Sequence, residues 1–129
     1  MRYLLSILMV VYTLIFPAIV AHSVSEGISL KEKNTLFKLA DCESDHDPIA
    51  INENDNGSPS YGKFQYKLKT FKWLVVKYNL LDPKNLEEAD WINWIMDGQF
   101  QTELTLLVIR NEPLWQNHWL NCSNSEDLW

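Results

Sequence analysis

DCES at residues 41–44, followed after a polar loop by SYGKFQ at residues 60–65, sets the expected fold and chemistry of this chain. The first stretch places the carboxylate of Glu43 at the end of an apolar helical stripe. The second stretch combines a turn at Gly62 with the amide of Gln65, close enough in sequence to face that carboxylate. An acid that faces a turn across a cleft is suited to general acid chemistry.

A capping box marks the start of the helix that carries this acid. Ser29 and Glu32 have the three-residue spacing in which each side chain binds the other's backbone N–H. Apolar residues such as Leu36 and Leu39 then recur at helical spacing, and the predicted helix ends near residue 44. Because Glu43 lies on the same stripe, we expect desolvation to raise its pKa and to keep it protonated near neutral pH.

The rest of the chain predicts a small helical protein. Residues 45–60 are rich in Asp, Asn, Ser, Pro and Gly and are expected to form a long polar loop, or else a small hairpin. Helices are predicted from about Leu68 to Tyr78, and over residues 86–111 in two pieces that meet near Asp97. Pro113 is expected to end the helical part. No stretch alternates long enough to predict a sheet, so the expected fold class is all-α, or mainly α.

The N-terminal segment has the pattern of a secretory signal peptide. Arg2 precedes a nearly unbroken apolar run over residues 3–20, and small residues follow at Ala21 and Ser23. We expect residues 1–22 to be cleaved and residues 23–129 to form one exported domain, which is periplasmic, extracellular or associated with the cell wall. The alternative is an uncleaved segment that anchors the chain in a membrane, since the run is just long enough to span a bilayer.

Composition argues against several classes of partner and cofactor. The chain carries a net charge of −6, and its lysines are interleaved with apolar residues instead of clustered, which argues against binding of nucleic acid. The oxygen-bearing side chains of residues 45–56 do not have the spacing of an EF-hand calcium loop. We therefore expect no metal and no cofactor, and we expect the chain to act as a monomer.

The chain contains two cysteines, Cys42 and Cys122. In an exported protein such a pair predicts a disulfide, here between the end of the first helix and the C-terminal tail; two unpaired buried thiols are the alternative. A cysteine nucleophile is not expected, because neither His46 nor His118 has an evident orienting partner in the sequence. The six tryptophans are expected mainly in the core, with stacking on sugar rings as the alternative.

The segment from Glu43 to Gln65 resembles the lytic transglycosylase (SLT-type) branch of the lysozyme-like superfamily. Members have a Glu-Ser pair at a helix end, then Asn-Pro-x-Ala, then an element of the type Ser-x-Gly-Leu-Met-Gln. This chain has ES at 43–44, DPIAIN at 47–52 and GSPSYGKFQ at 57–65, in the same order and at similar spacing. The ending WLNC at 119–122 also resembles small exported relatives in which that cysteine pairs with one just before the glutamate.

The resemblance implies a lysozyme-like helical domain and assigns roles to matching positions only. Glu43 takes the place of the catalytic acid, and Ser44 takes the place of a serine that helps to hold the site. The element that lines the cleft opposite the acid, and so contributes to substrate binding, is matched by Ser60, Tyr61, Gly62 and Gln65.

Two departures from the family pattern are present. The family's Leu-Met is KF at 63–64 here, and its later Ala-Tyr-Asn element on a distal helix has no clear counterpart. In the family, that element helps to bind substrate and to hold the acid. The residues considered for its role in this chain are Gln101 and Tyr78.

The implied function is cleavage of peptidoglycan glycan strands at the β-1,4 bond between N-acetylmuramic acid and N-acetylglucosamine. In a lytic transglycosylase, Glu43 would act first as acid and then as base toward the sugar's own 6-hydroxyl, giving a 1,6-anhydro product. The alternative is a lysozyme-type reaction that gives a hydrolysed product. Most glycosidases pair two carboxylates. The acids considered as a second carboxylate are Asp45, Asp47, Asp55 and Asp97. The alternative function is a non-catalytic glycan-binding or interaction module on the same fold.

Overall fold

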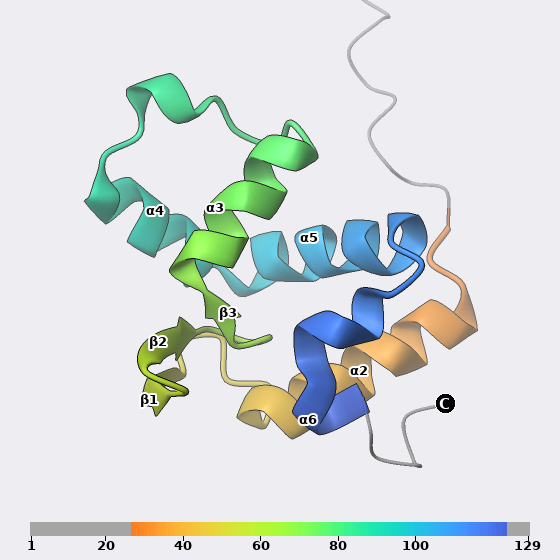
Figure 1. Cartoon of the computed structure of the whole chain (residues 1–129). Helices are drawn as coiled ribbons and strands as arrows, with labels where there is room; N and C mark the ends of the chain where they lie inside the picture. Colours follow the sequence, from red (N-terminus) through yellow and green to blue (C-terminus); the bar gives the residue numbers. More distant parts are fainter. Residues whose placement is uncertain (1–26, 124–129) are drawn as a thin grey trace, which may run out of the picture.

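The computed structural model describes residues 27–123 and is mainly helical, with a small antiparallel sheet (Figure 1). The predicted signal peptide, residues 1–22, lies outside the described residues, as does Trp129. Among residues 27–123, none of the helices has the length and apolar character needed to cross a membrane. The mainly helical prediction is confirmed, whereas the sheet corrects the stricter all-α class.

Helix α2 (Leu30–Ser44) begins and ends where the sequence predicts. The hydroxyl of Ser29 accepts from the backbone N–H of Glu32 at 3.2 Å, and the carboxylate of Glu32 accepts from the backbone N–H of Ser29 at 2.7 Å. This reciprocal pair satisfies N–H groups that the start of a helix otherwise leaves unpaired. Leu36 and Leu39 are buried, so the predicted apolar stripe packs on the core.

Strands β1 (Ile51–Asp55), β2 (Ser58–Tyr61) and β3 (Tyr66–Lys67) form an antiparallel sheet in that order. The prediction of a loop over residues 45–60 is therefore wrong for its second half, and the hairpin alternative is confirmed. The two residues of the NG pair at 56–57 join β1 to β2 with φ of 51° and 83°, the left-handed geometry of tight hairpin turns. Alternation did not reveal the strands, because β1 is almost wholly exposed and buries no apolar face.

Helices α3 (Leu68–Lys77), α4 (Glu88–Ile95) and α5 (Gly98–Asn111) match the predicted helical segments, and a short 3₁₀ helix, η1 (Pro83–Asn85), precedes α4. Asp97 accounts for the break between α4 and α5. Its carboxylate accepts from a backbone N–H in the first turn of α5 at 2.8 Å and so caps that helix.

The chain stays helical beyond Pro113, contrary to the prediction. A 3₁₀ helix, η2 (Trp115–Trp119), and a short helix, α6 (Leu120–Ser123), follow it. Trp115 and Trp119 are buried, with ring centroids 6.2 Å apart. Pro113 follows the end of α5, but burial of two large aromatic side chains favours a new compact segment on the core.

The core contains large side chains from all the main helices and from the bend after β2. Phe64 and Phe71 are fully buried, and the ring of Tyr66 packs edge-on against Phe71 at 5.9 Å. The expectation that tryptophans fill the core is confirmed for Trp91, Trp115 and Trp119. Trp73 departs from it, since 52% of its surface is exposed.

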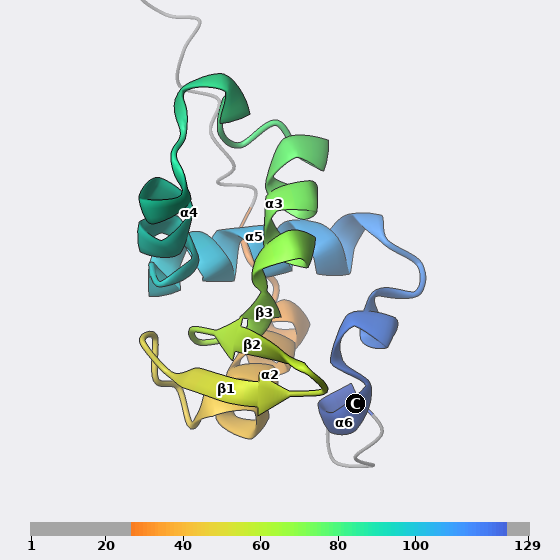
Figure 2. The same cartoon turned by 60° about the vertical axis from the view of Figure 1, so that its left-hand side comes forward.

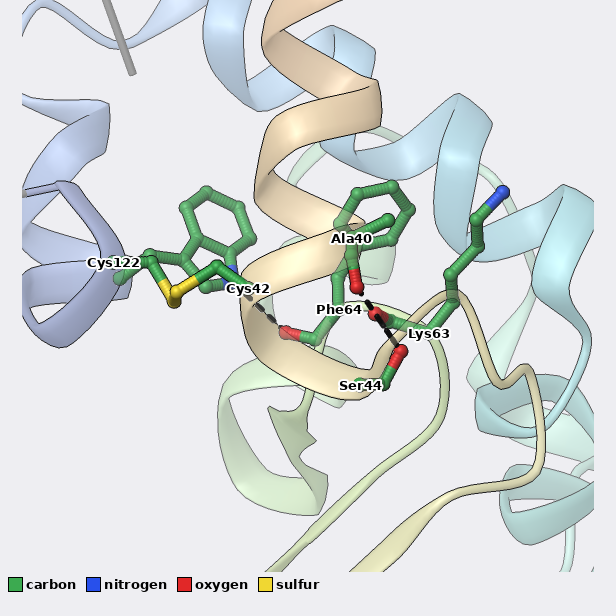
Figure 3. The surroundings of a disulfide bond; sticks show 7 residues. Ala40, Cys42, Ser44, Lys63, Phe64 and Cys122 are labelled. Carbon is green, nitrogen blue, oxygen red and sulfur yellow. Dashed lines mark hydrogen bonds between the residues drawn. A yellow bond between two sulfur atoms is a disulfide. The ribbon is translucent and has the colours of Figure 1, made fainter. Parts of the chain in front are cut away.

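A disulfide joins Cys42 near the end of α2 to Cys122 in α6 (Figure 3), as the sequence predicts. The two Cα atoms are 5.9 Å apart, and the residues are separated by 80 positions. The bond holds the tail against the turn of α2 that carries Glu43. Since both cysteines are bonded to each other, neither is a nucleophile.

Reduction of this disulfide should lower the free energy of unfolding by about 4 kcal/mol, because an 80-residue loop then regains its freedom in the unfolded chain. The measurement is denaturant unfolding with and without reductant. The double variant Cys42→Ala/Cys122→Ala serves as the control, and reductant should leave its unfolding curve in place. An unchanged midpoint for the parent protein would mean that the pair does not form.

Candidate active site

A groove of about 330 Å³ opens beside the end of α2. Its walls come from the tip of the hairpin, from the start of α3 and from the tail. In Figure 2 the ribbons of β1 and β2 lie to the left of α6, and α3 rises above β3. The residues that line the groove are Glu43, Asp55, Asn56, residues 65–67, Thr70 and residues 117–121.

Glu43, the residue that the sequence suggests as the acid, lies in the wall of this groove. It lies in the last turn of α2 and is half-buried. Burial, and secondly the negative charge of Asp55, raise the pKa of Glu43 to about 7. A carboxyl group with this pKa carries its proton in a large fraction of molecules at neutral pH, so it can donate that proton to a leaving oxygen.

Asp55 is the second carboxylate of the groove. It ends β1, and its Oδ2 lies 3.3 Å from the ammonium of Lys67. Lys67 is itself held, because it donates to the backbone carbonyl of Asp55 and, at 2.9 Å, to the hydroxyl of Ser58. The groove therefore contains a carboxyl group with a raised pKa and a carboxylate with a fixed counter-charge.

The other acids considered as second carboxylates have structural roles outside the groove lining. Asp45 adopts a left-handed conformation at the end of α2, with φ of 55°. Asp47 accepts from the backbone N–H of Ile49 at 2.9 Å, which closes a turn. Asp97 caps α5.

Gly62 begins a bend that only glycine fits. Its φ is 76°, and a Cβ there would overlap the amide nitrogen of Gln101 and approach the carbonyl of Ile95 to 2.8 Å. The amide of Gln101 is wholly buried under the bend. It accepts from the backbone N–H of Phe64 at 2.8 Å and donates to the carbonyl of Tyr61 at 2.9 Å and to that of Ile95.

Two further side chains hold the same bend. The hydroxyl of Ser44 donates to the carbonyl of Lys63 at 2.7 Å (Figure 3). The indole N–H of Trp119 donates to the carbonyl of Phe64 at 2.8 Å. Ser44 is next to Glu43 in the chain. The bend is thus fastened to the helix turn that presents the acid.

Gln65 is the residue of the bend that reaches the groove. Its backbone has a φ of 51°, and its amide oxygen accepts from the buried hydroxyl of Ser60 at 2.8 Å. Its amide nitrogen donates to the carbonyl of Gly62 at 2.8 Å. These bonds fix the side chain of Gln65 in one orientation on the groove wall.

The tail forms the wall that the sequence did not indicate. His118 lines the groove and has an orienting partner after all, since its Nε2 lies 3.4 Å from the carboxylate of Glu112. Glu112 also accepts from Lys77 at 2.6 Å and from Tyr78 at 2.9 Å. Burial acts to raise the pKa of Glu112, but the hydrogen bonds from Lys77, Tyr78 and His118 outweigh it and lower that pKa below its ordinary value.

The structure brings together some of the predicted site residues and places others behind them. Glu43 and Gln65 line the groove. The remaining four predicted substrate-binding residues are outside its lining and belong to the bend or to its supports: Ser44, Ser60, Tyr61 and Gly62. The disulfide was the one signal in the sequence that could have placed the tail here, because it ties residue 122 to the end of α2.

Comparisons of the chain with protein-family models, with curated proteins and with solved structures found no match.

Gln101→Met should lower the free energy of unfolding by about 3 kcal/mol, because it keeps the volume of the side chain but removes the partners of buried backbone groups in the bend. The measurement is denaturant unfolding. Gln99→Met, which changes an exposed glutamine two residues earlier on α5, is the control and should change stability by less than about 0.5 kcal/mol. Equal effects of the two changes would show that the amide of Gln101 does not support the bend.

Glu43→Gln should stabilise the protein at alkaline pH and leave it unchanged at pH 4. The pKa of Glu43 rises from 4.5 to about 7 on folding, so its ionised form destabilises the fold progressively across that interval. The full shift corresponds to roughly 3 kcal/mol, and partial exposure reduces the expected gain to about 1–2 kcal/mol.

Thermal unfolding from pH 4 to pH 8.5 measures this effect. Glu103→Gln removes an exposed carboxylate of α5 and should show no such pH dependence. A constant difference between Glu43→Gln and the parent protein at all pH values would contradict the raised pKa.

Proposed function

We propose that this chain is an exported, lysozyme-like glycosidase that cleaves the β-1,4 bond between N-acetylmuramic acid and N-acetylglucosamine in peptidoglycan. The observation that carries the proposal is Glu43, a half-buried carboxyl group with a raised pKa in the wall of a groove. The disulfide supports export, because such bonds persist in oxidising compartments.

Glu43 acts as the general acid in this proposal. It donates its proton to the oxygen that joins the two sugars, the bond from that oxygen to the anomeric carbon breaks, and an oxocarbenium-like centre develops. The same groove excludes part of the solvent, so the proton donor and the developing charge interact more strongly than they would in water.

Asp55 supplies the negative charge that the developing cation requires. It lies in the same groove and contributes to the raised pKa of Glu43. The two carboxyl groups have different surroundings, since Glu43 is desolvated while Asp55 has the ammonium of Lys67 beside it. In glycosidases, such a difference in surroundings decides which carboxyl group donates the proton and which one stabilises the developing positive charge.

The presence of Asp55 favours hydrolysis over formation of a 1,6-anhydro ring. With a second carboxylate in the groove, water can complete the reaction, and Glu43 then regains its proton. The resemblance to lytic transglycosylases instead implies that Glu43 alone acts, first as acid and then as base toward the sugar's own 6-hydroxyl. The two routes give fragments that differ by the mass of one water.

Gln101 takes over part of the role of the missing Ala-Tyr-Asn element in this proposal. Its amide holds the bend that carries Gln65, from beneath the groove. Tyr78 is not among the groove residues, and its hydroxyl donates to Glu112. In this proposal, the buried amide of Gln101 thus compensates in part for the absence of the family's Ala-Tyr-Asn element.

Digestion of purified cell wall, followed by mass spectrometry of the soluble fragments, tests the function. The parent protein should release disaccharide-containing fragments, with activity falling as the pH rises above about 7, where Glu43 loses its proton. Glu43→Gln should abolish release, and Asp55→Asn should reduce it by about 10²-fold or more. Hydrolysed ends are the expected product.

Glu103→Gln is the matched control, because it removes an exposed acid outside the groove lining and should retain the parent activity. Near-normal release by Glu43→Gln would refute the assignment of the acid. Binding of the wall by the parent protein without any soluble fragment would favour the glycan-binding module instead.

A further inference from the structure

Trp73 is the large aromatic side chain of α3 that the core does not use. The buried face of α3 carries Phe71, Leu74 and Val75, whereas 52% of Trp73 is exposed. Tryptophan is strongly buried on average, so exposure of this size on a well-ordered helix requires an explanation.

The position of Trp73 on its helix makes it continuous with the groove. Thr70 lines the groove, and Trp73 and Lys77 follow it at spacings of three and seven residues, which places all three on one side of α3. The stripe therefore leads from the groove beside Glu43 along the side of α3. In Figure 2 this helix rises from β3, at the level of the sheet and α6, toward the far end of the molecule.

The ring of Trp73 contacts Lys77, which is linked through Glu112 to a residue of the groove wall. The ammonium of Lys77 lies 4.7 Å from the centroid of the ring, and it donates to Glu112 at 2.6 Å. Glu112 in turn lies 3.4 Å from His118, a residue of the groove wall. A ring oriented in this way loses little freedom when a ligand covers its open face.

We propose that Trp73 is a platform that stacks on a pyranose ring of the glycan strand, beyond the sugars that lie next to Glu43. The ligand class is a β-1,4-linked strand of N-acetylhexosamines, which combines polar edges with apolar C–H faces. This inference rests on the proposed function, and it extends the binding site to a further sugar of the strand.

The character of the surfaces favours a glycan strand over a protein partner. The groove is lined mainly by carboxyl, amide, hydroxyl and imidazole groups, which suit the hydroxyl and acetamido groups of sugars. A polar groove that continues onto one oriented aromatic ring is the combination that a linear sugar polymer requires.

Titration of the Glu43→Gln protein with chitohexaose, monitored by the indole N–H signals in NMR spectra, tests the platform. Chitohexaose is a soluble hexamer of β-1,4-linked N-acetylglucosamine. The signal of Trp73, identified by its loss in Glu43→Gln/Trp73→Phe, should shift together with signals of groove residues. Adding Trp73→Ala should weaken binding of the hexamer by about tenfold, and Trp73→Phe should retain part of the affinity.

Phe37→Ala is the matched control, because it removes an exposed aromatic side chain of α2 that is outside the groove lining. It should leave the affinity within about twofold of its parent. Thermal unfolding verifies that each variant folds.

Two failures can be told apart. Shifts confined to groove residues, with affinity unaffected by Trp73→Ala, would overturn the platform and leave the proposed function standing. No shift at any signal, together with no release of wall fragments by the parent protein, would overturn the proposed function and the platform with it.

Discussion

The bend at residues 62–65 joins β2 to β3, and side chains from three helices bind its backbone groups. Gln101 of α5 binds the N–H of Phe64, Trp119 of η2 binds its carbonyl, and Ser44 of α2 binds the preceding carbonyl. Unsatisfied polar groups at this depth cost about 1–3 kcal/mol each, so the three helices are pinned to one point. Since Glu43 adjoins Ser44, the same bonds that complete the bend also set the place of the acid.

The helices could be predicted from the sequence because their signals are local. A capping box at Ser29 and an N-cap at Asp97 mark two helix starts, and apolar periodicity marks the buried faces. The hairpin carries a local turn signal at 56–57, but β1 shows no alternation because it is almost wholly exposed, and β2 is only four residues long. The tail after Pro113 is held by contacts distant in sequence, such as the bond of Trp119 to Phe64, and no local pattern encodes these.

In the candidate site, too, some residues could be predicted from local sequence patterns and others could not. The position of Glu43 follows from one helical stripe, so the sequence predicted both its burial and its raised pKa. The importance of Gln101 did not follow, because a glutamine inside a helical segment has no signature that separates a buried amide from a solvated one. The wall formed by His118 depends on where the disulfide and the bend place the tail. Residues such as Ser60 and Gly62 belong to the predicted element, yet they act on the groove through Gln65.

The groove contains two acids in different surroundings, because the fold places them on different kinds of element. Glu43 ends a helix that is packed on the core, so its carboxyl group is desolvated and its pKa rises. Asp55 ends a strand at an exposed hairpin, where Lys67 is tied to the backbone of the turn and supplies a fixed positive charge. The proposed mechanism depends on this difference, because two acids at the end of the same buried helix would both resist ionisation and would leave no carboxylate to stabilise a cation. The small sheet, which is the least predictable part of the fold, therefore supplies the second carboxyl group of the groove.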